Sequence, residues 1–286
     1  MQISEKDWKA YITKLRKLND KAAELVVRYV QQHGFADREA LIAYCYQVVE
    51  KYGTGSAALS AAMYDATALM SQAAVPAAEM ASIASYGDVA KTVNGVLKTS
   101  SNVDELAGAV SRWVKKAGCD TTLQNAIRDG RTIDIYDYKR KKYGKKRNTG
   151  AQFAWIPSGD TCAFCLALAA NGWQNQSVGA EKNHVEHIHS NCDCTYAVRF
   201  SDDGGVAGYD PDAIADQIWH DVLEQGADDD YKSLDVMYHG AFNSDVINAV
   251  RRQNYAENKA KIRAQQNSAA EKRRELNSSK AEESEA

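Results

Sequence analysis

Apolar side chains recur at helical spacing in the first part of the chain. Ser4 and Asp7 fit a helix-capping box, and the apolar stripe that follows predicts a helix ending near Gly34. The stripe consists of Trp8, Tyr11, Ile12, Leu15, Leu18, Ala22, Leu25, Val26, Tyr29 and Val30. Asp37 can cap a second amphipathic helix, which we expect to stop at Gly53.

Three further helical segments follow before residue 130. The alanine-rich stretch SAALSAAMYDATALMSQAAV runs to Pro76, and its small side chains would let helices approach closely. Apolar spacing predicts one helix over about Val89 to Leu97 and another over about Val103 to Lys116. Residues 1–130 therefore predict a helical N-terminal domain built as a bundle.

The pattern changes from helical to alternating after residue 130. Ile133, Ile135 and Tyr136 alternate with polar residues, the segment FAWIP follows, and Tyr196, Val198 and Phe200 alternate near residue 200. Alternation of this kind indicates strands. We expect a small β-rich module over residues 131–200.

The last part of the chain is strongly charged. Residues 202–230 contain acidic side chains and no Lys or Arg, around a predicted helix from Asp212 to Glu224. We therefore expect an acidic helical segment over 201–249 and a charged helical or disordered tail over 250–286. The predicted fold class is α+β, mainly α: a helical bundle, a small β-rich module stapled by zinc, and a helical C-terminal tail.

Composition narrows the functional classes. The formal net charge of -3 argues against a chain that coats nucleic acid or membranes, and no apolar run is long enough for a transmembrane helix. The N-terminus has no apolar signal core, so we expect synthesis in the cytosol, where isolated cysteines stay reduced. Cys45 and Cys119 are then most simply small buried hydrophobic residues.

The remaining four cysteines form two closely spaced pairs. Cys162 and Cys165 form C-x2-C, Cys192 and Cys194 form C-x-C, and His189 precedes the second pair by three residues. Tetrahedral Zn²⁺ takes four sulfur or nitrogen ligands, and short-spaced pairs supply two at once. The spacing therefore predicts a closed structural zinc site, with Cys162, Cys165, His189 and Cys194 preferred and Cys192 nearly equal to Cys194.

Other interpretations of the cysteines stay open. A thioredoxin-type redox pair needs a βαβ context that the sequence lacks, and four buried thiols without metal are also possible. His184 and His187 are spare ligands, but H-x-x-H-x-H is not the helical H-E-x-x-H arrangement of zinc proteases. A zinc nuclease using His189 and Asn191 is an alternative that lacks a second carboxylate at a recognisable spacing.

A basic run lies just before the cysteine segment. It consists of Lys139, Arg140, Lys141, Lys142, Lys145, Lys146 and Arg147. The run is either a solvated loop or a contact with the nucleic-acid backbone or with an acidic partner surface. A backbone contact would read no sequence and would weaken steeply with salt.

The segments DTCAFCLALAANGW and HIHSNCDCTYAVRF resemble the MuF-type minor head proteins of tailed bacteriophages, in the branch of Gram-positive phages and prophages. The helical first half, the segment IRDGRTIDIYDYKRKK and the segment YDPDAIADQIW also suit that branch. The resemblance implies that the metal or structural cluster of the family corresponds here to Cys162, Cys165, His189, Cys192 and Cys194. Asp193 departs from the pattern, because many relatives have arginine between the last two cysteines.

The resemblance implies a non-enzymatic minor capsid protein of the phage head. Such a protein is made in the host cytoplasm and lies inside the virion head, near the portal. It would assist head assembly, DNA packaging or DNA delivery. The expected partners are the portal protein and other head proteins, with packaged DNA a candidate partner of the basic run and no membrane contact. The alternative function is a metal-dependent nuclease or prophage toxin that uses the cysteine and histidine cluster.

Overall fold

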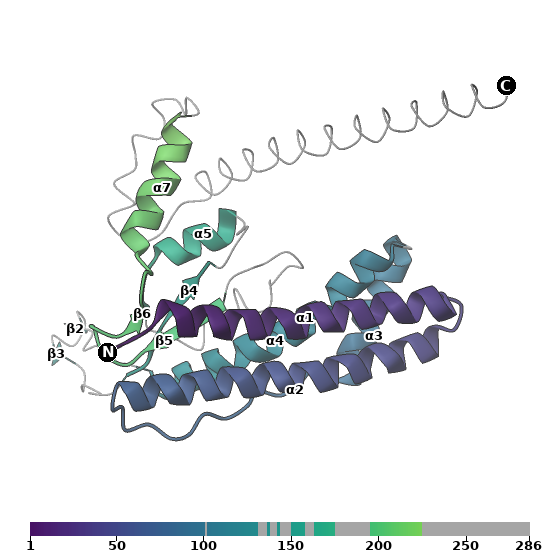
Figure 1. Cartoon of the computed structure of the whole chain (residues 1–286), viewed down its shortest axis with the longest axis horizontal. Helices are drawn as coiled ribbons and strands as arrows, with labels where there is room; N and C mark the ends of the chain where they lie inside the picture. Colours follow the sequence, from purple (N-terminus) through teal and green to yellow (C-terminus); the bar gives the residue numbers. More distant parts are fainter. Residues whose placement is uncertain are drawn as a thin grey trace, which may run out of the picture.

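A bundle of long helices forms most of the structure. The computed structural model describes residues 1–100, 102–130, 136–137, 142–143, 150–157, 163–174 and 195–224. Its first helices are α1 (Glu5–His33), α2 (Arg38–Met70), α3 (Tyr86–Thr99) and α4 (Val103–Arg128). α1 and α2 run side by side in opposite directions, with α3 and α4 packed against them (Figure 1). The predicted helical bundle is confirmed.

Side-chain caps set the helix starts. The Ser4 hydroxyl accepts a hydrogen bond from the Asp7 backbone N–H, and Asp37 accepts one from the Ala40 backbone N–H. Both predicted caps are confirmed. α3 begins three residues before its predicted start, because the Ser85 hydroxyl accepts a bond from the Asp88 backbone N–H and so caps an additional turn.

The predicted stop at Gly53 is wrong. α2 continues through Gly53 and the alanine-rich stretch to Met70, as one helix of 33 residues. Gly53 is buried, and a Cβ placed there would lie 3.3 Å from Ile83 Cγ2 and 3.6 Å from Ala117 Cβ. The glycine therefore permits close packing of neighbouring segments, and it does not terminate the helix.

α4 also extends beyond its predicted end, from Lys116 to Arg128. Its second half buries small and polar residues, which do not produce an apolar stripe in the sequence. These buried residues include Gly118, Cys119, Thr121, Thr122 and Asn125. At Gly118 a Cβ would lie only 2.6 Å from Ser56 Oγ and 2.8 Å from Ser60 Oγ, so α4 meets α2 there at very short range.

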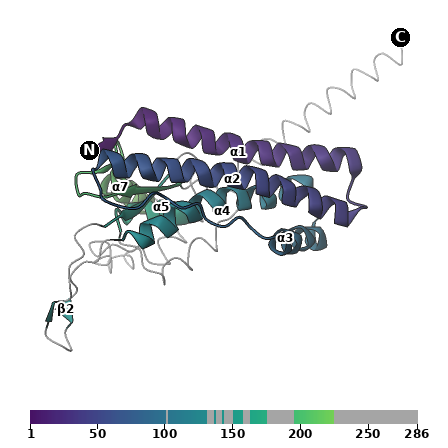
Figure 2. The same cartoon turned by 90° about the horizontal axis from the view of Figure 1, so that it is seen from below.

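Short strands follow the bundle. β4 (Gln152–Ile156) pairs antiparallel with β5 (Thr195–Arg199), in a register that joins Ile156 to Thr195. β2 (Tyr136–Asp137) pairs antiparallel with β3 (Lys142–Tyr143), and Figure 2 shows β2 apart from the helices. The predicted strand character around 136, in FAWIP and around 196–198 is confirmed. Ile133 and Ile135 lie outside the described residues.

The N-terminus joins this second part of the fold. β1 (Gln2–Ile3) pairs in parallel with β6 (Gly205–Val206). Gly205 has a φ of 120°, and a Cβ there would lie 2.5 Å from Trp173 Cζ2, so only glycine fits. Ile3 and Val206 then pack with residues of α1, β4 and β5 in one apolar cluster.

The β4–β5 ladder shares its core with the helices. One buried cluster contains Tyr64 of α2 and Leu123 of α4 together with aromatic and aliphatic side chains of both strands: Phe153, Trp155, Tyr196 and Val198. An isolated pair of strands is marginal in water, and each large apolar side chain contributes roughly 1.5–3 kcal/mol when fully buried. The ladder therefore depends on α2 and α4 for its stability.

Two more helices lie beside the ladder. α5 (Ala163–Ala170) and α7 (Pro211–Glu224) contact each other (Figure 1). α7 matches the predicted helix from Asp212 to Glu224. The helical prediction is wrong for residues 201–210, which form turns and the strand β6, because Gly204, Gly205 and Gly208 favour turns there. Residues 225–249 and the predicted tail lie outside the described residues. In the described part, no helix is long and apolar enough to cross a membrane. The described fold is mainly helical with a small amount of sheet.

We predict that Gly118→Ala lowers the free energy of unfolding by about 1–3 kcal/mol, because the new methyl group would overlap the Ser56 and Ser60 hydroxyls. The matched control is Gly95→Ala in α3, where a Cβ meets nothing within 4 Å. That change should leave stability equal or raise it by up to about 1 kcal/mol through helix propensity. Denaturant unfolding measures both. Equal effects at the two sites would contradict close α2–α4 packing.

Candidate functional site

The structure describes one of the five predicted metal ligands. Cys165 lies on α5 and is fully buried, in the same apolar cluster as Phe153 and Trp155. The other four predicted ligands, Cys162, His189, Cys192 and Cys194, lie outside the described residues, as do the spare ligands His184 and His187. The structure therefore neither brings the five together nor separates them.

The residues that flank the two cysteine pairs do belong to one packed unit. Ala163, the first residue of α5, directly follows Cys162, and Thr195, the first residue of β5, directly follows Cys194. Thr195 is paired with Ile156 at the end of β4, and α5 contacts β4. The described elements that adjoin both pairs are thus held in a single core.

The described residues alone contain no group of three or more Cys, His, Asp or Glu side chains that could hold a metal ion. Because most predicted ligands lie outside that part, zinc binding stays a prediction. Cys45 and Cys119, predicted as buried hydrophobic residues, are confirmed as buried. Burial raises the pKa of the Cys45 thiol to about 12, so this thiol stays protonated at neutral pH.

The basic run is described only at Lys142, whose backbone belongs to β3. The other predicted contact residues, Lys139, Arg140, Lys141, Lys145, Lys146 and Arg147, lie outside the described residues. Lys142 pairs antiparallel with Asp137 of β2. Contact of this run with DNA or a protein stays a prediction.

A hydrogen-bond network joins the C-terminal end of α4 to α2 and to Ala151, the residue just before β4. The Tyr64 hydroxyl is buried and lies 2.9 Å from both the Asn125 carbonyl oxygen and Asp129 Oδ2. Arg128 donates to the Asp129 carboxylate at 2.8 Å, and the Ala151 N–H donates to the Asp129 carbonyl oxygen at 2.8 Å. Burial raises the pKa of Tyr64 far above its usual range, so the hydroxyl remains a donor. This network positions β4, and with it the approach to the cysteine segment.

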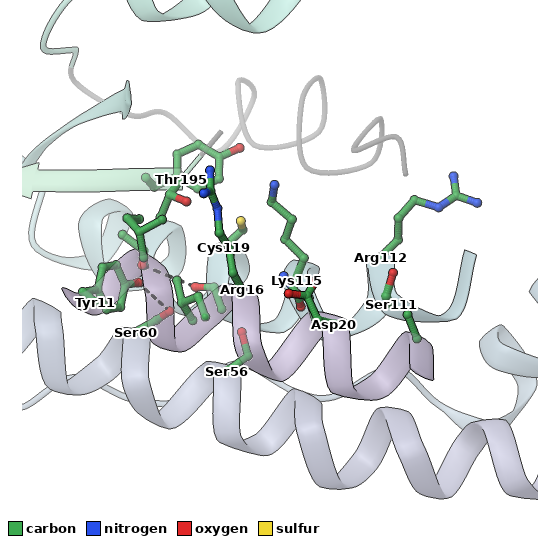
Figure 3. A pocket seen from close by; sticks show the side chains of 17 residues that line it. Tyr11, Arg16, Asp20, Ser56, Ser60, Ser111, Arg112, Lys115, Cys119 and Thr195 are labelled. Atoms are coloured by element: carbon green, nitrogen blue, oxygen red, sulfur yellow. Dashed lines mark hydrogen bonds between the residues drawn. The ribbon is translucent and has the colours of Figure 1, made fainter. Parts of the chain in front are cut away.

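A cavity of about 260 Å³ adjoins the start of β5. It lies between α1, α2 and α4, and Thr195 and Tyr196 of β5 also line it (Figure 3). Hydroxyl groups form much of its inner surface: Ser56, Ser60 and Thr122 are buried, and Tyr11 Oη and Ser60 Oγ lie 2.9 Å apart in a hydrogen bond. Burial raises the pKa of Tyr11 well above its usual range, so the Tyr11 hydroxyl stays uncharged at neutral pH.

Charged side chains line the same cavity. Arg16 and Asp20 come from α1, and Arg112 and Lys115 come from α4. In Figure 3, Arg16, Lys115 and Arg112 extend in the same direction, away from α2. Three cations and one carboxylate give the lining a positive formal charge. Sequence reasoning missed this site, because its cations are far apart in the chain and follow no motif.

A second, larger recess of about 840 Å³ lies between the first turns of α1 and α7. Its lining is mainly apolar and includes Trp8, Ile12, Ile156, Val206 and Ile218. It offers surface for apolar contact, whereas the first cavity offers charge and hydrogen-bond donors.

Comparison with known proteins identifies a protein family. A family model described as VG15 protein matches residues 2–220. No curated protein and no solved structure shows a significant match. The matched range includes the helical bundle, the basic run, both cysteine pairs and most of α7.

Proposed function

The chain belongs to the VG15 protein family, a viral family that indicates a phage-encoded protein, and from this premise we propose that it is a minor capsid protein of a tailed bacteriophage. In this proposal the protein is of the MuF type, has no enzymatic activity and lies near the portal inside the procapsid. There it assists head assembly, DNA packaging or DNA delivery through contacts with the portal and other head proteins.

The family match over residues 2–220 is the observation that carries the proposal. One family model spans the bundle and the cysteine segment together, which is the same order of parts on which the resemblance to minor head proteins depends. The shared core of α2, α4, β4 and β5 supports a structural role, because it makes the flanks of the cysteine segment part of a rigid scaffold. Neither the family match nor the described residues support the nuclease or toxin alternative.

We further propose that the cysteine segment holds a structural zinc ion. The donor set of four cysteines and one histidine fits the ligands that zinc prefers. Cys165 fits such a role because it is fully buried on α5, at the junction with the β4–β5 ladder. When bound, zinc would link the cysteine pairs and stabilise the loop between them, and it would take no part in a reaction.

We predict that the purified full-length chain contains about one zinc per molecule and that Cys165→Ala removes it. Cys45→Ala is the matched control, since both side chains are 0% exposed and the two truncations leave cavities of the same kind. Both variants should lose some stability, but only Cys165→Ala should lose metal, as measured by elemental analysis of the folded fraction. Full zinc content in both variants would remove Cys165 from the site, and no zinc in the wild type would refute the staple.

We predict that the chain is present in purified virions and procapsids in few copies, as measured by quantitative mass spectrometry. Deletion of its gene from an inducible phage should yield defective heads or non-infectious particles, and expression in trans should restore infectivity. Its absence from both particles would refute the head role. Host killing on expression alone, abolished by His189→Ala, would instead establish the toxin alternative.

We propose that the basic run contacts packaged DNA through backbone phosphates. Replacing Lys141, Lys142 and Lys145 by Gln should weaken duplex binding for every sequence. It should also make the slope of log K against log salt shallower by about 0.9 for each phosphate that the variant leaves without a cation. The control replaces the exposed residues Lys6, Lys14 and Lys17 of α1 by Gln, an equal change in net charge. Identical salt slopes for the two triple variants would contradict a specific role for the run.

A further inference from the structure

Arg112, which lines the cavity between α1, α2 and α4, has a buried N–H donor without an acceptor among the described residues. Arg112 Nε is inaccessible to solvent and has no hydrogen-bond partner among the described residues. A buried polar group without a partner costs roughly 1–3 kcal/mol, and more when the group is charged. Arg112 is among the residues that line the cavity, so its guanidinium, with one N–H already lacking an acceptor, is close to any anion bound there.

The charge around Arg112 favours an anion. Arg16 and Lys115 line the same cavity, with Asp20 as the one acidic residue of the lining. Arg16 and Lys115 have other interactions as well, so their contribution is positive charge rather than an unused donor. Opposite charge at short range in a partly enclosed site is screened less than on an open surface.

The remaining lining suits a compact polar ligand. Tyr11, Ser60 and Thr122 contribute hydroxyl groups to the lining, beside apolar side chains such as Ile12 and Leu15. The cavity volume of about 260 Å³ is many times the ~10–15 Å³ that one water needs. A tetrahedral oxyanion with accompanying waters therefore has room.

We propose that this cavity binds a phosphate group, with Arg112 as the principal donor and with Arg16 and Lys115 supplying positive charge. The planar guanidinium presents several N–H donors at once, a geometry that matches phosphate oxygens. The phosphate belongs either to a free small anion or to a nucleic-acid backbone, and both sources present the same oxygens. The site goes beyond the proposed head role, and the isolated protein suffices to test it.

The test measures binding of inorganic phosphate to the full-length protein by calorimetry and by ³¹P line broadening. The wild type should bind, and Arg112→Gln should weaken binding by about 10- to 100-fold, as expected for loss of a charge-assisted hydrogen bond. Arg38→Gln is the matched control, since it removes one arginine charge at the exposed start of α2. It should change affinity less than about twofold, because Arg38 does not line the cavity. Arg112→Lys keeps the charge but lacks the Nε donor, and it should bind with intermediate affinity.

Competition with a short duplex of arbitrary sequence separates the two sources. Displacement of phosphate by duplex in the wild type, with weaker duplex binding in Arg112→Gln, would assign the site to backbone phosphate. Phosphate binding that duplex does not affect would assign it to a small anion. No phosphate binding by the wild type, or equal affinity in the folded Arg112→Gln and Arg112→Lys variants and the wild type, would overturn the proposal.

Discussion

The α2 and α4 helices meet at very short range where Gly118 faces Ser56 and Ser60, and both the shared core and the cavity depend on this approach. A side chain at position 118 would occupy space that the two serine hydroxyls fill. Small buried residues continue along both helices, among them Ala57 and Ala61 of α2 and Ala117 and Thr121 of α4, and they let the two backbones pack closely. Close packing of small polar side chains, rather than a continuous apolar stripe, thus fixes the second half of the bundle.

Two candidate functional regions depend on that contact. On one side, Tyr64 and Leu123 reach the β4–β5 ladder and bury its aromatic side chains, so the elements adjoining the cysteine segment become part of the bundle core. On the other side, Ser56, Ser60 and Gly118 line the cavity that Arg112 and Lys115 also border. Rigid positions of this kind suit contacts with other molecules, because flexible contacts would lose conformational entropy at each interface.

The sequence predicted the features that depend on local chemistry. The caps at Ser4 and Asp37 were recognisable, because a side-chain oxygen before an apolar stripe acts on the nearest backbone N–H groups. Gly53 was misinterpreted as a stop, because the contacts that make a buried glycine necessary come from Ile83 and Ala117, far away in sequence. The sequence also does not predict the second half of α4, because the side that faces α2 carries small and polar residues instead of an apolar stripe.

One candidate site could be found from the sequence, and the other could not. The cysteine pairs were found because metal ligands cluster in sequence, whereas the cavity was missed because its lining comes from four separate elements. Only the fold brings Arg16 and Arg112 to one surface, and no local motif marks either residue.

The proposed zinc ion would hold the cysteine segment on a core shared by helices and sheet. X-ray absorption at the zinc edge of the full-length protein tests it most directly. We expect a four-ligand shell dominated by sulfur at about 2.3 Å, with a nitrogen at about 2.0–2.1 Å. A shell of oxygen and nitrogen alone, or the absence of bound zinc in a folded and zinc-supplied protein, would contradict it.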